Sequence, residues 1–459
     1  MAFQRKKVQK RQVKKPEKRK YRRYTFQSPR GMKDILPSDY LYYDYIIQQA
    51  RKILPFYGFK RMEPPLLEKA ELFQKGVGAH TDIVEKEMYV LRTKDKGEFL
   101  ALRPEYTAGI VRAYIENGMS NWIQPVKLYS FGPVFRHEKP QAGRYRQFYQ
   151  LNVEAIGEED PVIDGEVILV AKVFLESLGF KSSQLRLRIN SIGCAECRPA
   201  YKRALKKYYR RYQKEIGPLG RKHLQNNPLR LLDCKDPRCR RFQEGAPPSL
   251  DYLCPNCKEH FKKVLEILDS LNVSYILDKT LVRGLDYYTK TVFEFELENK
   301  KESEEEENER KRKEHLSLAG GGRYDDLVKI FGGPDTPAVG VAFGIERIIE
   351  HLKKEKKITF PRPRVFLVQI GDTAQRKAIT LLEKFRRENV PLAENLGKSS
   401  LRAQLRSADR LNVDYTLILG QKEVLDGMII LRDMKSGIQE LLPLETIVST
   451  IKKRLHQKS

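Results

Sequence analysis

Residues 127–157 read KLYSFGPVFRHEKPQAGRYRQFYQLNVEAIG and contain the pattern that decides the fold. The segments 127–136 and 145–156 have the composition of β-strands, and the stretch between them is a polar loop with Pro and Gly. This pattern predicts an antiparallel hairpin with a long connection. Gln150 and Glu154 are four residues apart on the second strand, so both should project from the same face into one pocket.

The segments on either side of this hairpin predict further strands and helices. Residues 39–56 have the pattern of a helix, and Thr107 stands where the N-cap residue of another helix belongs. Three more segments have the pattern of strands, namely 97–102, 185–190 and 292–297. The fold class we predict is therefore α+β, with an antiparallel sheet flanked by helices.

The order of these elements predicts several domains, as a chain of 459 residues should have. We expect one domain to be split into residues 28–193 and 271–355. The segment 194–270 contains helix-like pieces and is interpreted as an insertion. From 362 to 459 strand and helix patterns alternate, which predicts a separate α/β domain with a mostly parallel core.

The chain is strongly basic, with a net charge of +27. Residues 1–24 hold twelve Lys or Arg against the single acid Glu17, and the remaining 435 residues still carry +16. Such a balance indicates polyanionic partners. We interpret residues 1–27 as a basic disordered arm that attracts RNA phosphates, and residues 298–314 as a charged low-complexity loop.

Targeting and membrane signals are the next feature of the sequence. No run of about 18 apolar residues is present, so no membrane span is expected. The N-terminal residues lack the apolar segment of a signal peptide. We therefore expect a cytoplasmic protein without a membrane partner.

All six cysteines fall between residues 194 and 257. Two CxxC pairs, Cys194 with Cys197 and Cys254 with Cys257, match the ligand pattern of a structural zinc site. The alternative is a set of reduced, partly buried thiols. About 56 residues separate the two pairs, more than in the usual zinc knuckle, so the sequence leaves both interpretations open.

Arginines recur in polar stretches at predicted strand ends and turns. Arginine suits phosphate binding because its guanidinium group is permanently charged and fork-shaped. The chain contains neither a GxxxxGK[ST] loop nor a GxGxxG fingerprint, which excludes a Walker site and a dinucleotide-binding turn. The stretches are RPEYT at 103–107, RHE at 136–138, GRYRQF at 143–148, RGLDYY at 283–288 and GGGRYD at 320–325, followed by GVAFGIERI.

In chain order these stretches resemble the histidyl-tRNA synthetases, which are class II aminoacyl-tRNA synthetases. The segment FRHEKPQAGRYRQFYQLNVEAIG is similar to motif 2 of that class, GVAFGIERI to motif 3 and PPLLE at 64–68 to the end of motif 1. LVRGLDYYTKTVFEF and AGGGRYDDLV resemble the two histidine-specific signatures. The resemblance runs from about residue 28 to the C-terminus and implies a catalytic domain, an insertion domain and a C-terminal anticodon-binding domain.

The resemblance also implies roles for individual residues. Arg136 would bind the α-phosphate and the substrate carboxylate, Arg283 would act at the α-phosphate, and Arg347 would hold the γ-phosphate. Arg144 would contact ATP or the tRNA end. Around histidine, the positions that match the family are Glu105, Tyr106, Thr107, Arg136, Gln150, Glu154, Arg283, Tyr287 and Tyr288. Many family members have Gly where this chain has Tyr106, which places the geometry of that loop in question.

The resemblance further implies the partners and the reaction: ATP-dependent activation of L-histidine and transfer to histidine tRNA by a homodimer, with Mg²⁺ on the outer phosphates of ATP. Two alternatives share the scaffold. One is a regulatory paralogue that activates a histidine-biosynthetic enzyme, which predicts lost substrate residues and no anticodon-binding domain. The other is a noncatalytic RNA sensor. Histidine-dependent pyrophosphate exchange would separate both from a ligase.

Overall fold

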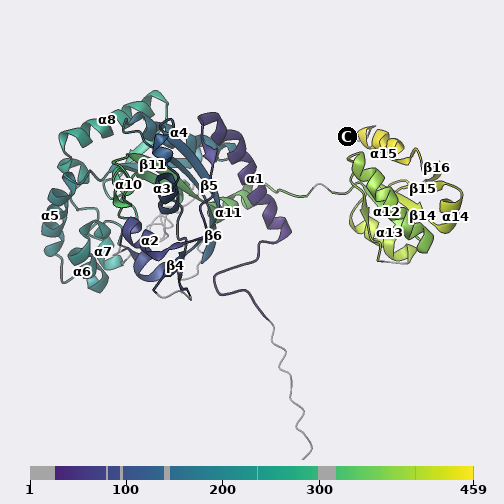
Figure 1. The fold of residues 1–459 in the computed structure, drawn as a ribbon, viewed down its shortest axis with the longest axis horizontal. Coiled ribbons are helices and arrows are strands. Elements are labelled where there is room, and N and C mark those ends of the chain that lie inside the picture. Colours follow the sequence, from purple (N-terminus) through teal and green to yellow (C-terminus); the bar gives the residue numbers. More distant parts are fainter. Residues whose placement is uncertain are drawn as a thin grey trace, which may run out of the picture. The chain divides into compact units, whose positions relative to one another are not determined.

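The computed structural model describes residues 26–78, 81–93, 97–138, 145–234, 236–297, 317–360, 362–397 and 400–457. Residues 1–25 of the basic arm, the charged segment 298–314 and Arg144 lie outside the described residues. The chain forms two compact units, residues 1–358 and 359–459, each described by itself (Figure 1). Within the described residues no helix is long and apolar enough to cross a membrane.

The first unit is built on an eight-stranded sheet with the order β1-β5-β6-β11-β10-β9-β7-β8. Its six inner strands run antiparallel to one another, as the sequence predicted. The hairpin predicted for residues 127–156 forms the pair β5 and β6, with Lys127 opposite Ala155 and Phe135 opposite Gln147. The inner strands are β5 (Val126–Phe135), β6 (Gln147–Ile156), β7 (Leu185–Ser191), β9 (Thr289–Leu297), β10 (Ser317–Arg323) and β11 (Ala338–Gly344).

The two edge strands differ from the prediction of an antiparallel sheet. β1 (Lys60–Arg61) runs parallel to β5, and β8 (Tyr275–Leu277) runs parallel to β7. A parallel neighbour needs a long crossover, and the chain between β7 and β8 supplies one through the helical insertion and helix α8 (Pro255–Ser270). The sheet is therefore mixed. A separate three-stranded sheet, β2-β4-β3, is formed by β2 (Leu67–Lys69), β3 (Val90–Arg92) and β4 (Phe99–Leu102).

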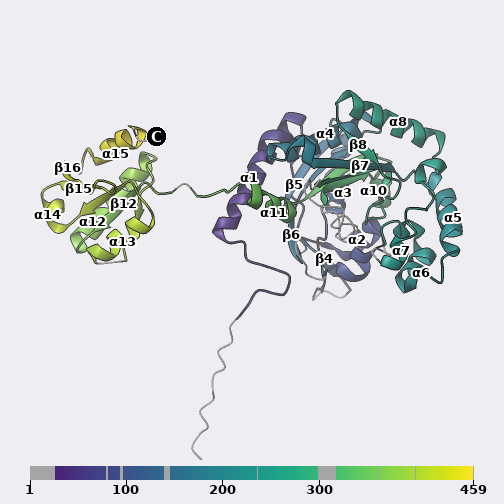
Figure 2. The same cartoon turned by 180° about the vertical axis from the view of Figure 1, so that it is seen from behind.

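One face of the large sheet is apolar and is covered by helices. Leu151, Val153 and Ala155 of β6 point into this core, so their even-numbered neighbours on the strand point to the other face. The covering helices are α1 (Pro37–Ile53), α4 (Val162–Ser177), α8 and α11 (Ile345–Glu355). In both views of the unit α8 lies beside α4 (Figures 1 and 2). This burial fixes the register of the strands and turns the second face, which carries Gln150 and Glu154, away from the core.

The helical insertion has a small core of its own. Tyr201, Leu205 and Tyr209 of α5 (Cys197–Arg210) pack with residues from α6 (Gly217–Asn226) and the turns that follow. By contrast Phe261 and Val264 of α8 belong to the large core under the sheet. The independent part of the insertion thus ends before α8, earlier than residue 270, because the apolar residues of α8 pack into the core under the large sheet. Helix α7 (Pro237–Arg240) completes the insertion.

The second unit has a five-stranded sheet with the order β13-β12-β14-β15-β16. β12 is parallel to β13 and β14, whereas β15 and β16 form an antiparallel hairpin, so the parallel part covers three strands only. The strands are β12 (Val365–Gln369), β13 (Ala393–Glu394), β14 (Tyr415–Leu419), β15 (Met428–Asp433) and β16 (Gln439–Pro443). The helices are α12 (Asp372–Arg387), α13 (Leu401–Arg410), α14 (Gln421–Leu425) and α15 (Ile447–Gln457).

Candidate active site

A hollow on the polar face of the large sheet forms the candidate active site. In its centre β11 and β10 carry small residues, with Ala342 opposite Gly320 and Gly340 opposite Gly322. Taller side chains border this row, because Glu154 of β6 is paired with Gly340 and Glu294 of β9 with Gly320. The cavity holds about 1100 Å³ of empty space, a figure that includes open solvent at its mouth.

Two of the glycines are required by close approach. A Cβ atom at Gly340 would overlap the carboxylate of Glu154, and one at Gly320 would overlap the guanidinium group of Arg283. The row of small residues therefore gives two charged side chains room to lie flat over the sheet.

Arg136, Arg283 and Arg347 come from distant parts of the chain and line the same cavity. Contacts with the protein position each of the three side chains. Arg136 donates through Nε to the Pro104 carbonyl (2.9 Å), and Arg347 through Nη1 to the Ser317 carbonyl (2.8 Å). Nη1 of Arg283 lies 3.2 Å from Oε1 of Glu294. The structure thus brings together the three arginines that the sequence singled out, while leaving their functions as predictions.

Glu154 is the centre of a buried hydrogen-bond network. Its carboxylate accepts from the Tyr324 hydroxyl (2.6 Å), the Thr107 hydroxyl (2.7 Å) and the Asn152 amide (3.3 Å). Burial raises the pKa of Glu154 to about 7, although the three hydrogen bonds act in the opposite direction and favour the carboxylate. A carboxyl group with such a pKa can accept or donate a hydrogen bond near neutral pH.

Glu105 occupies the N-terminus of helix α3 (Thr107–Glu116) beside this network. Its carboxylate accepts hydrogen bonds from the backbone N–H groups of Thr107 (2.7 Å) and Ala108 (2.9 Å). Burial raises the pKa of Glu105, with the two backbone N–H groups opposing the shift. The prediction that Thr107 is the N-cap was therefore wrong: the Thr107 side chain points to Glu154, and Glu105 binds the backbone N–H groups that a cap would satisfy.

Aromatic rings complete the part of the cavity that contains Glu105 and Glu154, which we call the Glu154 slot. Tyr287 and Tyr288 line the cavity with ring centroids 4.7 Å apart, and the Tyr287 hydroxyl lies 3.5 Å from Glu105. Among the described residues, Oε1 of Gln150 and Oδ1 of Asn152 are buried without a hydrogen-bond partner. Buried polar atoms normally have partners, so these two oxygens indicate where a ligand can donate hydrogen bonds.

Tyr106 is the exception among the predicted histidine-binding residues. It is fully buried in an apolar cluster and does not line the cavity. Its hydroxyl accepts a hydrogen bond from Nη2 of Arg103 (2.5 Å) and donates one to Glu63 (2.9 Å). The structure therefore contradicts the prediction that the Tyr106 side chain lies in the histidine pocket. The side chain turns behind the loop and packs under the Arg103 guanidinium group.

Several lining residues were not predicted from the sequence. Tyr324 lies in the GGGRYD stretch, but nothing in that pattern indicated that its hydroxyl would bind Glu154. Asn152 had a clearer signal, since it lies midway between Gln150 and Glu154 and must share their face of the strand. Glu346 also lines the cavity, and its carboxylate accepts from the Tyr43 hydroxyl and the Tyr149 backbone, both at 3.0 Å.

The predicted metal ligands form a second cluster, which does not line the cavity. The sulfur atoms of Cys194, Cys197, Cys254 and Cys257 all lie within 4.8 Å of one another. Among the residues that the structure describes, this is the sole group of three or more Cys, His, Asp or Glu side chains placed to hold one ion.

The mixed sheet with Arg136 at the end of its central hairpin and Arg347 on the helix after its last strand is the arrangement of a class II aminoacyl-tRNA synthetase. A family model described as "Histidyl-tRNA synthetase" matches residues 31–348, and one described as "Anticodon binding domain" matches residues 364–454. The chain belongs to the histidyl-tRNA synthetase family, and as a member it is an aminoacyl-tRNA ligase for histidine.

Individual relatives agree with this membership. The chain is 44% identical over 433 residues to a "Histidine--tRNA ligase" of Dehalococcoides mccartyi, covering 94% of this chain and all of the relative. It is 41% identical to the enzyme of the same name from Desulforamulus reducens, covering 93% and 99%. Among solved structures, apo histidyl-tRNA synthetase of S. aureus has a TM-score of 0.73 at 33% identity, covering 93% and 99%.

A more distant structure shares the fold alone. It is an "ATP phosphoribosyltransferase regulatory subunit/histidyl-tRNA synthetase" from Bacillus halodurans, with a TM-score of 0.61 at 22% identity, covering 87% of this chain and 99% of that one. The fold by itself therefore does not distinguish a ligase from a regulatory relative, and the residues of the cavity must carry that distinction.

Proposed function

We propose that the cavity performs both steps of histidine–tRNA ligation with the residues described above. In the first step a carboxylate oxygen of histidine attacks the α-phosphorus of ATP, and the bond to pyrophosphate breaks. In the second step a terminal ribose hydroxyl of the tRNA attacks the carbonyl carbon of histidyl-adenylate, and AMP leaves. The observation that carries the proposal is the convergence of Arg136, Arg283 and Arg347 on one hollow.

These arginines would act by positioning and by charge neutralisation. The attacking carboxylate and the triphosphate are both anionic, so their approach is unfavourable unless cations lie between and around them. Arg136 and Arg283 would hold the α-phosphate and the carboxylate together, and Arg347 would bind the γ-phosphate end. No protein nucleophile is required in this scheme.

The slot beside the arginines would bind histidine. Its ammonium group would lie against oxygen atoms of Glu105, Thr107 and Gln150, where Oε1 of Gln150 has no protein partner among the described residues. The imidazole ring would lie between Tyr287, Tyr288 and Glu154. An amino acid without ring nitrogens would leave the Glu154 carboxylate with an unmet hydrogen bond, which is a strong basis for discrimination.

Two metal ions belong to this proposal, and they would bind at different sites. Mg²⁺ would bind oxygens of the triphosphate and water. The described residues offer it no cage of three carboxylates, which suits an ion that keeps most of its water and contacts few protein groups. Zinc would belong to the cysteine quartet, away from the reacting atoms.

The remaining partners follow the domain organisation. The C-terminal unit would bind the anticodon region of histidine tRNA, and Arg402 and Arg406 on α13 are available for phosphate contacts. A cytoplasmic location would place the enzyme with its substrates. A homodimer would be formed through the motif 1 region, where Leu66 and Leu67 are exposed. Light scattering that finds only monomer at micromolar concentration would count against the dimer.

Amino-acid-dependent exchange of pyrophosphate into ATP tests the proposal. We expect exchange with histidine and none with glutamine, asparagine or phenylalanine, and we expect charging of histidine tRNA by the same preparation. A folded protein that binds histidine or tRNA but supports no exchange would overturn the proposal. That result would favour the regulatory paralogue or the noncatalytic RNA sensor.

A further inference from the structure

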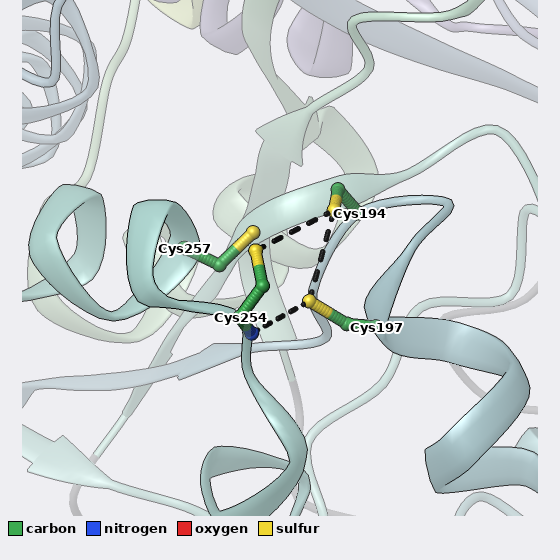
Figure 3. Close-up of side chains that lie close together, drawn as sticks. All are labelled: Cys194, Cys197, Cys254 and Cys257. Atoms are coloured by element: carbon green, nitrogen blue, oxygen red, sulfur yellow. Dashed lines mark hydrogen bonds between the residues drawn. The ribbon is translucent and has the colours of Figure 1, made fainter.

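The four cysteine sulfur atoms have the spacing of ligands around one tetrahedral ion. The Cys194 sulfur lies 3.7 Å from that of Cys197 and 3.9 Å from that of Cys254 (Figure 3). A tetrahedron with zinc–sulfur bonds of about 2.3 Å has edges of roughly 3.8 Å. A disulfide would need sulfur atoms about 2.05 Å apart, and all six cysteines are free thiols.

The backbone prepares both cysteine pairs for this arrangement. Cys197 is the first residue of α5 and Cys254 is the N-cap of α8, so each pair lies at the start of a helix, beside backbone N–H groups that have no partner within the helix. The Cys254 backbone N–H donates to the Cys197 sulfur at 3.1 Å. Gly193 has a φ of +70°, and a Cβ atom there would lie 2.5 Å from the Cys197 Cβ. Glycine is therefore needed at position 193, where the chain turns into the first cysteine pair.

The two pairs come from chain segments separated by the whole helical insertion. Cys194 and Cys197 lie where the chain leaves strand β7, and Cys254 and Cys257 lie where it enters α8. An ion bound to all four sulfurs would cross-link the two ends of the insertion, and we call this cross-link the clasp. Four cysteine ligands leave no open position for water or substrate, which characterises a structural and not a catalytic zinc site.

We propose that the quartet binds one zinc ion and that this clasp positions the histidine-binding segment 283–288. The connection runs through hydrogen bonds next to the ligands. Nη2 of Arg198, which follows Cys197, donates to the Tyr288 carbonyl. The Lys290 N–H donates to the Gly193 carbonyl at 3.0 Å, and the Ile192 N–H donates to the Lys290 carbonyl at 2.9 Å. The residues that flank the first cysteine pair thus hold the backbone on which Tyr287 and Tyr288 are placed.

Metal analysis of the full-length protein tests the site without any assay of activity. Protein purified without added metal or chelator should contain about one zinc ion per chain. Replacement of that ion by cobalt(II) should give the intense visible spectrum of a tetrahedral tetrathiolate complex. A metal-free protein with four reactive thiols in this region, or a cobalt spectrum of octahedral type, would overturn the site.

The other two cysteines provide matched controls in the same segment. Cys234 and Cys239 are buried in the small core of the insertion, outside the quartet. Cys194→Ser and Cys257→Ser should lose most of the zinc, whereas Cys234→Ser and Cys239→Ser should retain it. Equal zinc loss in both groups would show that the quartet is not the ligand set. If the quartet variants fail to fold, the cobalt spectrum of the unaltered protein still decides.

The positioning role rests on the proposed function and needs a separate measurement. Arg198→Ala should retain zinc and raise the KM for histidine roughly tenfold, with little change in the KM for ATP, because the Tyr288 carbonyl loses a charged donor. Arg203→Ala, at an exposed position of the same helix, is the control and should leave both KM values unchanged. An Arg198→Ala enzyme with an unchanged KM for histidine would refute the positioning role, while the zinc measurement would stand.

Discussion

Two arginines in neighbouring signatures, Arg323 and Arg283, show how a structural charge differs from a functional one. The guanidinium group of Arg323 is fully buried, and each of its three nitrogens donates to the protein: to Asp164, to Asp325 and to the carbonyl groups of Glu158 and Asp160. Arg283 has an ion pair with Glu294, but among the described residues its buried Nε has no hydrogen-bond partner. Arg283 lines the cavity, whereas Arg323 does not and has all three guanidinium nitrogens bound within the protein.

The same distinction applies to other buried polar side chains around the hollow. Buried polar groups that are satisfied within the protein stabilise or specify the fold, and those that are left unsatisfied mark a place for a ligand. Arg323, although it follows three glycines in a family signature, belongs to the first kind. Arg283, Gln150 and Asn152 belong to the second kind.

The largest effect that separates the two arginines should be on stability. Arg323→Met leaves Asp164 charged in a fully buried position, which should lower the free energy of unfolding by about 3–5 kcal/mol. Chemical unfolding followed by circular dichroism measures the change. Arg283→Met is the matched control and should change stability by less than about 1 kcal/mol. Equal destabilisation by the two substitutions would remove the distinction.

The second prediction concerns activity, for which Arg283 should matter more than Arg323. Arg283→Met removes a cation placed at the α-phosphate, so histidine-dependent pyrophosphate exchange should fall roughly 10²–10³-fold. The measurement requires a sample whose circular dichroism matches the unaltered protein. Exchange within a factor of a few of the original rate would contradict the assigned role.

The slot carboxylate should determine affinity for histidine. Glu154→Gln keeps the size of the side chain but removes its charge, and should raise the KM for histidine at least about tenfold while the KM for ATP changes little. Steady-state exchange measured over both substrates separates the two constants. A similar rise in both KM values would indicate general damage to the cavity.

The raised pKa of Glu154 predicts that the stability of the protein depends on pH. Burial raises this pKa from 4.5 to about 7, so the folded protein holds the proton more tightly than the unfolded chain. The contribution of Glu154 to stability is therefore fully present below about pH 4.5 and is lost as the pH rises to about 7. The difference in unfolding free energy between the original chain and Glu154→Gln should shift in favour of the variant over this window. A difference that is constant with pH would refute the shift.

The smallest expected effect concerns Tyr106, which replaces the glycine of many family members. Tyr106→Phe removes the hydroxyl that bridges Arg103 and Glu63 behind the loop, and should cost about 1 kcal/mol of stability. The KM for histidine should not change, because the side chain does not line the cavity. Isothermal titration with histidine checks this, and a loss of affinity of tenfold or more would restore Tyr106 to the pocket.

The parts of the fold that the sequence predicted are those with local patterns. The hairpin of β5 and β6 followed from two strand-like segments around a loop, and the shared face of Gln150 and Glu154 followed from the period of two along a strand. The convergence of Arg136, Arg283 and Arg347 was expected only from the family resemblance, since no spacing relates residues so far apart.

The parts that the sequence missed depend on contacts between distant segments. The parallel edge strands arise from crossovers, which leave no mark on the strands themselves. Glu105 binds the first backbone N–H groups of α3, while the Thr107 hydroxyl binds Glu154, which lies 47 residues further along the chain. The separation of 56 residues counted against a zinc site, yet the insertion folds back and brings the two cysteine pairs together.

The central claim is that the arginines and the Glu154 slot bind one substrate pair, and a crystal structure with histidine and a non-hydrolysable ATP analogue tests it most directly. The account predicts the α-phosphate and the histidine carboxylate between Arg136 and Arg283, with the imidazole ring in hydrogen-bond contact with Glu154. A nucleotide bound elsewhere, or a histidine whose ring points away from Glu154, would contradict it.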